Sequence, residues 1–237
     1  MTCVTYAMKR TIRADTMKEA EREELYASGM ASLAGDLAKA ERQFEQVVTT
    51  ATTADRLSSL AHVRIAVIRL LSGDVPGCAT ALERSLDGPD ARPQEEWVGQ
   101  LLQTAAQGAE KLRTQQRGDL ALPVLRRAVS IAQRARGDLA REAELGATVA
   151  IGSLECERGA VEAGLAALNT VARTPVAGLT LPQRSFVALA LFGLAQAREQ
   201  RDDAGGARSQ YEEIVRRFAD DNWPQTVRTV ALARVRI

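Results

Sequence analysis

Aromatic residues are scarce in this chain of 237 residues, because Phe, Trp and Tyr together make up only 4% of it. Hydrophobic residues still make up 46%, so a packed core has to be built mainly from Ala, Leu and Val, a composition that suits close-packed helices. An excess of charge is also lacking, with 31 Lys and Arg against 30 Asp and Glu and a formal net charge of +1. Such a balance gives no bulk attraction to nucleic acid or to anionic lipid, so we expect neither as a partner.

Cysteine and histidine are too few for most metal sites and disulfide frameworks. Cys3, Cys78 and Cys156 are scattered and odd in number, and His62 is the only histidine, for which we favour a core or interface role. A glycine-rich phosphate loop and a Gly-x-Ser-x-Gly elbow are both missing. We therefore expect no catalytic residue, no metal and no cofactor. An enzyme with an unrecognised site in a groove that holds His62 is kept as an alternative.

Long hydrophobic runs are missing as well. The most apolar segment, residues 186–197, is well short of the roughly 20 residues that a membrane-spanning helix needs. The start of the chain lacks the apolar stretch of a secretory signal. We expect no membrane span and a cytoplasmic location. Residues 1–16 are expected to be an N-terminal extension, for which disorder is one alternative, and residues 17–237 the folded region.

A recurring Gly-Asp pair indicates an internal repeat. It stands at Gly35-Asp36, Gly73-Asp74 and Gly118-Asp119, in altered form at Gly159-Ala160, and as Asp202-Asp203 in a divergent fifth copy. The intervals between these anchors are 38, 45, 41 and 43 residues. A compact residue follows every anchor by five positions. In every copy except the third, a bulky apolar residue also follows the anchor by nine positions and a small residue precedes it by seven; the third copy has Arg127 and Lys111 there. We interpret the third copy as shifted in register by an altered turn.

Each repeat is predicted to be a helix-turn-helix unit. Glycine suits the left-handed cap that ends one helix, and aspartate suits the cap that begins the next. Proline, which is favoured in a first helical turn, marks further helix starts at Pro76, Pro93, Pro182 and Pro224. The apolar residues between these signals recur at helical spacing, and no comparable stretch alternates with period two. The sequence therefore predicts about eleven helices and no sheet.

One stretch carries a family resemblance. Residues 128–138, Ala-Val-Ser-Ile-Ala-Gln-Arg-Ala-Arg-Gly-Asp, are followed by Arg141-Glu142-Ala143 and by a helix that ends at Arg158-Gly159. This passage from one repeat into the next resembles the tetratricopeptide repeat (TPR), in its longer bacterial and kinesin-light-chain-like form. The resemblance extends from Glu21 to about Ile237. It implies an all-α solenoid of about five antiparallel helix hairpins plus a C-terminal capping helix, with a concave groove that binds another protein or a peptide.

The first helices of a solenoid line its concave face, so the repeat register assigns the groove positions. The candidate groove residues come from the second, fourth and fifth repeats: Leu60, Arg64, Val67, Val149, Ser153, Leu189, Phe192 and Gln196. The segment 186–192 is apolar on every side, as a buried helix is. Either the C-terminal helix, expected over 225–237, or the helix stack covers it, or it forms an apolar groove for an amphipathic ligand helix.

These observations favour a non-enzymatic scaffold for protein or peptide binding in a bacterial-type cytoplasm. The first alternative is a ligand- or peptide-sensing regulatory domain of a bacterial transcription or signalling protein, and the second is the enzyme described above. The lysine and asparagine clamp by which some related domains hold an acidic peptide is missing, because its positions correspond to Leu25 and Gly29. The C-terminal helix either caps the solenoid or pairs with a second copy of the chain or with a larger protein.

Overall fold

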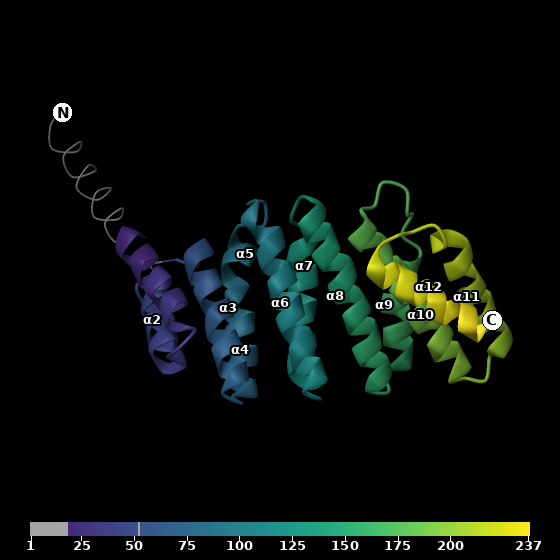
Figure 1. The fold of residues 1–237 in the computed structure, drawn as a ribbon, viewed down its shortest axis with the longest axis horizontal. Coiled ribbons are helices and arrows are strands. Elements are labelled where there is room, and N and C mark those ends of the chain that lie inside the picture. The colour runs from purple at the N-terminus through teal and green to yellow at the C-terminus, as the bar shows by residue number, and fades with distance from the viewer. Residues whose placement is uncertain (1–18, 52) are drawn as a thin grey trace. The chain divides into compact units, whose positions relative to one another are not determined.

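The computed structural model describes residues 19–51 and 53–237, and every regular element within them is a helix. The extension expected over 1–16 lies outside the described residues. Residues 19–32 are helical. Eleven further helices follow within the described residues: α2 (Leu37–Thr49), α3 (Arg56–Leu71), α4 (Val75–Ser85), α5 (Asp87–Ala91), α6 (Trp97–Thr114), α7 (Gly118–Ala132), α8 (Asp138–Glu157), α9 (Val161–Ala172), α10 (Leu181–Glu199), α11 (Ala204–Phe218) and α12 (Pro224–Arg236). The predicted all-α solenoid is confirmed (Figure 1).

Contacts divide the chain into two compact units, with the boundary between Arg92 and Pro93. The N-terminal unit contains the helical residues 19–32 and α2 to α5. The C-terminal unit contains α6 to α12. Among the described residues, no helix combines the length and the apolar character that crossing a bilayer requires.

In the N-terminal unit, an ion pair joins the helical residues 19–32 to the start of α3. The Arg22 guanidinium donates to both carboxylate oxygens of Asp55, at 2.7 and 3.0 Å, and to the carbonyl of Val47. Asp55 also caps α3, because its carboxylate accepts from the Ser58 amide while the Ser58 hydroxyl accepts from the Asp55 amide. Burial alone would raise the pKa of Asp55, but Arg22 and Ser58 outweigh it and hold this pKa below its ordinary value.

In the C-terminal unit, helices follow one another as antiparallel pairs. Each helix packs against its neighbours in the chain, and the first helices of successive pairs, α6, α8 and α10, also pack against one another. The helix α12 lies against α10 and α11. Contacts between elements close in sequence are the defining property of a solenoid, whose stability is a sum over adjacent interfaces.

The turns inside the helix pairs repeat with a constant interval. Four of the five turns place one residue at a positive φ: Gly73 (79°), Gln116 (59°), Gly159 (85°) and Asp202 (59°). Each of these residues lies 43 positions after the one before it. In each turn the next residue donates its N–H to the carbonyl five residues earlier, as Asp74 does to Arg69 at 2.8 Å. This pattern is the Schellman motif, and it satisfies the carbonyls at the end of the first helix.

The third turn lies two residues before the Gly118-Asp119 pair that the sequence suggested. Gln116 takes the left-handed position, and Gly118 is already the first residue of α7. With the anchor moved to Gln116, the two positions that failed in the third copy become Ala109 and Leu125, and the compact position becomes Ala121; all three are buried. The register shift inferred for this copy is confirmed, and its size is two residues.

One proline assignment was wrong. Pro76, Pro182 and Pro224 lie in first helical turns, as expected. Pro93 does not, because α6 begins four residues later, at Trp97. The connection before α6 contains the short helix α5, which packs on α3 and α4. Pro93 therefore lies in the connection between α5 and α6 and not in a first helical turn.

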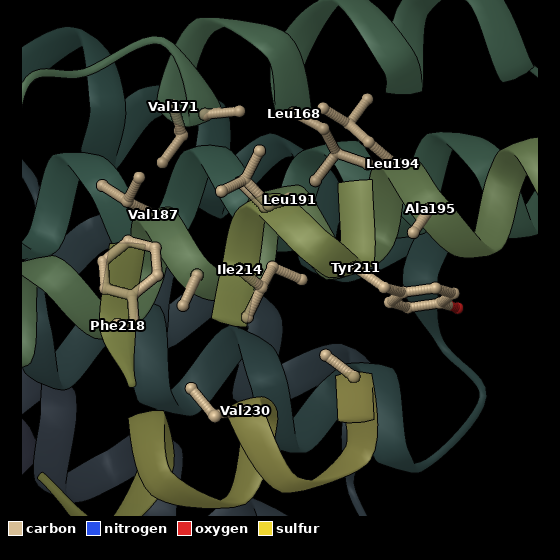
Figure 2. Packing of buried hydrophobic residues seen from close by; sticks show 14 of the residues in the cluster. Leu168, Val171, Val187, Leu191, Leu194, Ala195, Tyr211, Ile214, Phe218 and Val230 are labelled. Atoms are coloured by element: carbon tan, nitrogen blue, oxygen red, sulfur yellow. The ribbon is translucent and has the colours of Figure 1, made fainter. Parts of the chain in front are cut away.

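A hydrophobic core lies between α9, α10, α11 and α12, with Leu145 of α8 also packed into it (Figure 2). Leu168 and Val171 of α9 face α10, and Tyr211, Ile214 and Phe218 of α11 pack against its other side. The labelled core residues of α10 and α12 are Val187, Leu191, Leu194, Ala195 and Val230. One side of the all-apolar segment 186–192 is therefore buried inside the protein, which leaves its other side to be explained.

Candidate functional site

A cavity of about 460 Å³ lies in the C-terminal unit, on the side formed by the first helices α6, α8 and α10. A volume of this size is within the range of roughly 300–1,000 Å³ that is usual for ligand sites. The first helices of a solenoid line its concave face. The cavity is therefore where the repeat architecture places a groove.

Helix α8 forms the middle wall of the cavity. Its lining residues recur every three or four positions, which keeps them on one face of the helix: Glu142, Ala143, Gly146, Ala147, Val149, Ala150, Ser153 and Glu157. Gly146 and the three alanines of this wall have small or no side chains and so take up little of the cavity. A Cβ atom on Gly146 would lie 2.9 Å from Cζ of Phe186, so the missing side chain leaves room for the Phe186 ring on the helix backbone.

Helix α10 forms the apolar wall. Phe186, Leu189 and Phe192 line the cavity at a spacing of three residues, and Gln196 follows one turn later. The Phe192 ring packs against the ring of Tyr211 on α11, with centroids 5.4 Å apart, and this contact holds the Phe192 ring in place. The side of the segment 186–192 that the core does not bury therefore faces this cavity.

Helix α6 forms the polar wall, with Gln103, Gln107, Glu110 and Arg113 in the lining. Arg113 donates to Glu110 on its own helix at 2.6 Å and to Glu157 of α8 at 2.9 Å. The bond to Glu157 ties α6 to α8 at one end of the cavity, and the two carboxylates together neutralise the guanidinium. Two of the three carboxylates in the lining thus have a fixed cationic partner.

Glu142 is the third carboxylate, and it has no such partner. It is half-buried, and no described residue forms a hydrogen bond or an ion pair with its carboxylate. Burial raises the pKa of Glu142 above its ordinary value. A carboxyl group whose charged form is disfavoured by partial desolvation is stabilised by any cation that approaches it.

The structure brings five of the eight sequence-predicted groove residues together. Val149, Ser153, Leu189, Phe192 and Gln196 all line the cavity. The other three, which come from the second repeat, lie at helical spacing on α3 in the N-terminal unit and outside this lining: Leu60, Arg64 and Val67. The Arg64 guanidinium there donates to the Tyr26 hydroxyl at 3.4 Å, and Val67 is exposed.

Sequence reasoning missed the contribution of α6 and the two residues at the other end of the groove, Glu142 and Phe186. The α6 residues could have been found from the 43-residue interval, which places the first helix of the third repeat one period before α8. Phe186 had a signal, because it opens the apolar segment. Glu142 had no such signal, because the sequence does not show whether a glutamate is paired, exposed to solvent or half-buried without a partner.

The remaining reactive side chains lie away from this lining. His62 is half-buried on α3, and burial, with a smaller contribution from Arg84, lowers its pKa to about 4, so the ring is neutral at pH 7. Burial raises the pKa of the Cys78 thiol to about 11, which makes it a poor nucleophile. Among the described residues, no group of three or more His, Cys, Asp or Glu side chains is arranged to hold a metal ion.

Comparison with solved structures identifies the fold. The crystal structure of BtubC (BKLC) from P. vanneervenii matches with a TM-score of 0.54 over 98% of this chain and 88% of that chain, at 14% identity. The fold is a tetratricopeptide-like helical repeat. No family model matches the sequence. No curated protein matches it either. The likeness at this identity concerns the fold, so the function has to be argued from the cavity.

Proposed function

We propose that this chain is a non-enzymatic scaffold that binds another protein or a peptide segment in the groove between α6, α8 and α10. The observation that carries the proposal is the lining itself, in which the inner faces of three consecutive first helices combine an apolar wall with glutamine, serine and glutamate side chains. Apolar anchors at helical spacing are how grooves of this kind hold an amphipathic segment.

The 43-residue interval supports the finer assignment to the longer TPR form, which the kinesin-light-chain-like proteins represent. The same lining supports binding over catalysis. Its described residues include no histidine and no cysteine, and two of its three carboxylates are held by Arg113. The lining therefore offers neither a cysteine nucleophile nor a histidine base for covalent catalysis.

The test is binding of the neutral apolar dye Nile red to the full chain. We expect fluorescence enhancement by the wild type and at least a fivefold loss of it in Phe192→Asp, because a carboxylate in the apolar wall opposes entry of an apolar group. The matched control is Val235→Asp on α12, where the side chain is 84% exposed and outside the cavity. Helical circular dichroism verifies that both variants fold. Equal fluorescence from the wild type and from folded Phe192→Asp overturns the proposal.

A further inference from the structure

We propose that Glu142 is the anchoring site for a lysine or arginine of the bound segment, so that the ligand is a peptide with apolar side chains and a basic residue at one end of them. This inference rests on the proposed function and specifies its ligand. Three observations lead to it: the position of Glu142 beside the apolar wall, the lack of a partner for its carboxylate, and the charge balance of the groove.

The position of Glu142 sets the layout of the ligand. Glu142 stands one helical turn before Gly146 on α8, and the Phe186 ring lies on Gly146. The carboxylate is therefore at the end of the groove where the apolar wall begins. From Glu142 to Glu157 the helix rises about 22 Å, at 1.5 Å per residue. This length accommodates about four turns of a ligand helix or six to seven extended residues.

The charge of the groove favours a cationic ligand. Its lining contains three carboxylates and one guanidinium, and Arg113 is already bonded to Glu110 and Glu157. The nearest basic neighbour of Glu142 in the chain is occupied as well, because Arg141 pairs with Glu144. An acidic segment would meet uncompensated like charge here, whereas a basic residue would supply the missing partner.

Partial burial makes the pairing selective. The raised pKa of Glu142 reflects the loss of water around its charged form. A ligand cation restores part of the lost stabilisation, so its contribution exceeds that of an exposed surface pair. A neutral amide at the same place on the ligand would recover much less of it. We therefore expect discrimination between Lys and Gln in the peptide.

The test begins with a displayed library of random 15-residue peptides, selected on the full chain and eluted by competition. We expect the selected peptides to be enriched in Lys or Arg next to an apolar cluster, and to displace Nile red. Selection on Glu142→Lys is expected to shift the enrichment toward Asp and Glu. A selected peptide with its basic residue, and the same peptide with Gln in that place, are then titrated by fluorescence anisotropy.

We expect Glu142→Gln to weaken the basic peptide at least tenfold and to leave the Gln peptide within twofold. Glu212→Gln on α11 is the matched control, because it removes the same charge from a side chain that is 54% exposed and outside the lining, and it should change neither affinity by more than twofold. Circular dichroism verifies that the variants are folded.

The outcomes separate the two proposals. Groove-binding peptides that lack basic residues, or affinities that Glu142→Gln leaves unchanged, overturn the role of Glu142 and leave the scaffold function standing. Failure of every selected peptide to displace Nile red, or to lose affinity in Phe192→Asp, overturns the scaffold function and this inference with it.

Discussion

Two glycines set the distance between α8 and α9. Gly152 and Gly164 face each other where the helices cross, and a Cβ atom on Gly164 would lie 2.6 Å from the backbone oxygen of Gly152. It would also lie 2.9 Å from the backbone nitrogen of Cys156. Backbone atoms cannot turn aside as a side chain does, so a larger residue at Gly164 has to push the helices apart.

We therefore predict that Gly164→Ala lowers the free energy of unfolding by about 2–3 kcal/mol, the usual cost of overpacking a tight contact. The control is Gly205→Ala in α11, where no atom lies within 4 Å of the added methyl group. That variant should be unchanged or more stable by up to about 1 kcal/mol, because alanine is the better helix former. Urea denaturation followed by circular dichroism measures both. Similar stabilities for the two variants would contradict this account of the crossing.

At the scale of the element, two of the four turns with a positive φ have a residue other than glycine at that position, and glycine there would make them more stable. Gln116 and Asp202 adopt a positive φ of 59°, where an L-residue with a side chain is strained and glycine is not. Gly73 and Gly159 already supply glycine in the equivalent turns. The third and fifth turns therefore contain backbone strain that glycine would remove.

We predict that Gln116→Gly raises the free energy of unfolding by about 0.5–1 kcal/mol, because the relief of strain exceeds the entropy that glycine adds to the unfolded chain. The neighbouring substitution Gln115→Gly should have the opposite sign, since Gln115 has an ordinary φ of −85°. Urea titrations of the two variants provide the comparison. A loss of stability in Gln116→Gly would mean that its side chain stabilises the turn in some other way.

Most of the helix pairs could be predicted because their boundaries carry chemistry of their own. Asp74 and Asp203 cap α4 and α11 by accepting from the Gly77 and Gly206 amides, both at 2.9 Å, as the Gly-Asp rule expects. The third turn was misplaced because its left-handed residue is Gln116, while Gly118-Asp119 imitates the anchor two positions later. Local signals fail where packing between helices, rather than the turn residue, holds the conformation.

The lining of the cavity was predicted only in part for the same reason. The register of the fourth and fifth repeats selected Val149, Ser153, Leu189, Phe192 and Gln196, which all line it, because periodicity decides which residues share one face of a helix. Because the register of the third repeat was uncertain, no residue of α6 was among the predicted groove positions. The lone carboxylate of Glu142 depends on what its neighbours bond to, and such pairing is a tertiary property.

At the scale of the whole molecule, the C-terminal unit contains both a core and a groove of its own. The hydrophobic cluster around α10 lies entirely within residues 145–233, and the cavity is lined only by residues 103–225. We predict that the fragment 93–237 unfolds cooperatively on heating and binds Nile red within twofold of the full chain.

A fragment that starts at Gly118 is the control for this prediction. It lacks α6, so it loses the polar wall of the groove and uncovers the apolar residues of α7 and α8 that α6 contacts. We expect a broad thermal transition and weak dye binding from it. A broad transition in the fragment 93–237 as well would show that the C-terminal unit is not an independent folding unit.

The constant spacing of the turns has one more consequence. Since Gln116 and Gly159 occupy the same place in identical turns 43 residues apart, the stretch 117–159 is a complete cassette with matching ends. A tandem copy of this stretch, placed directly after the original, would join the chain through a junction that already exists. Duplication of the corresponding gene segment would therefore lengthen the solenoid by one whole repeat at a time, and each added repeat would supply further side chains for contact with a ligand.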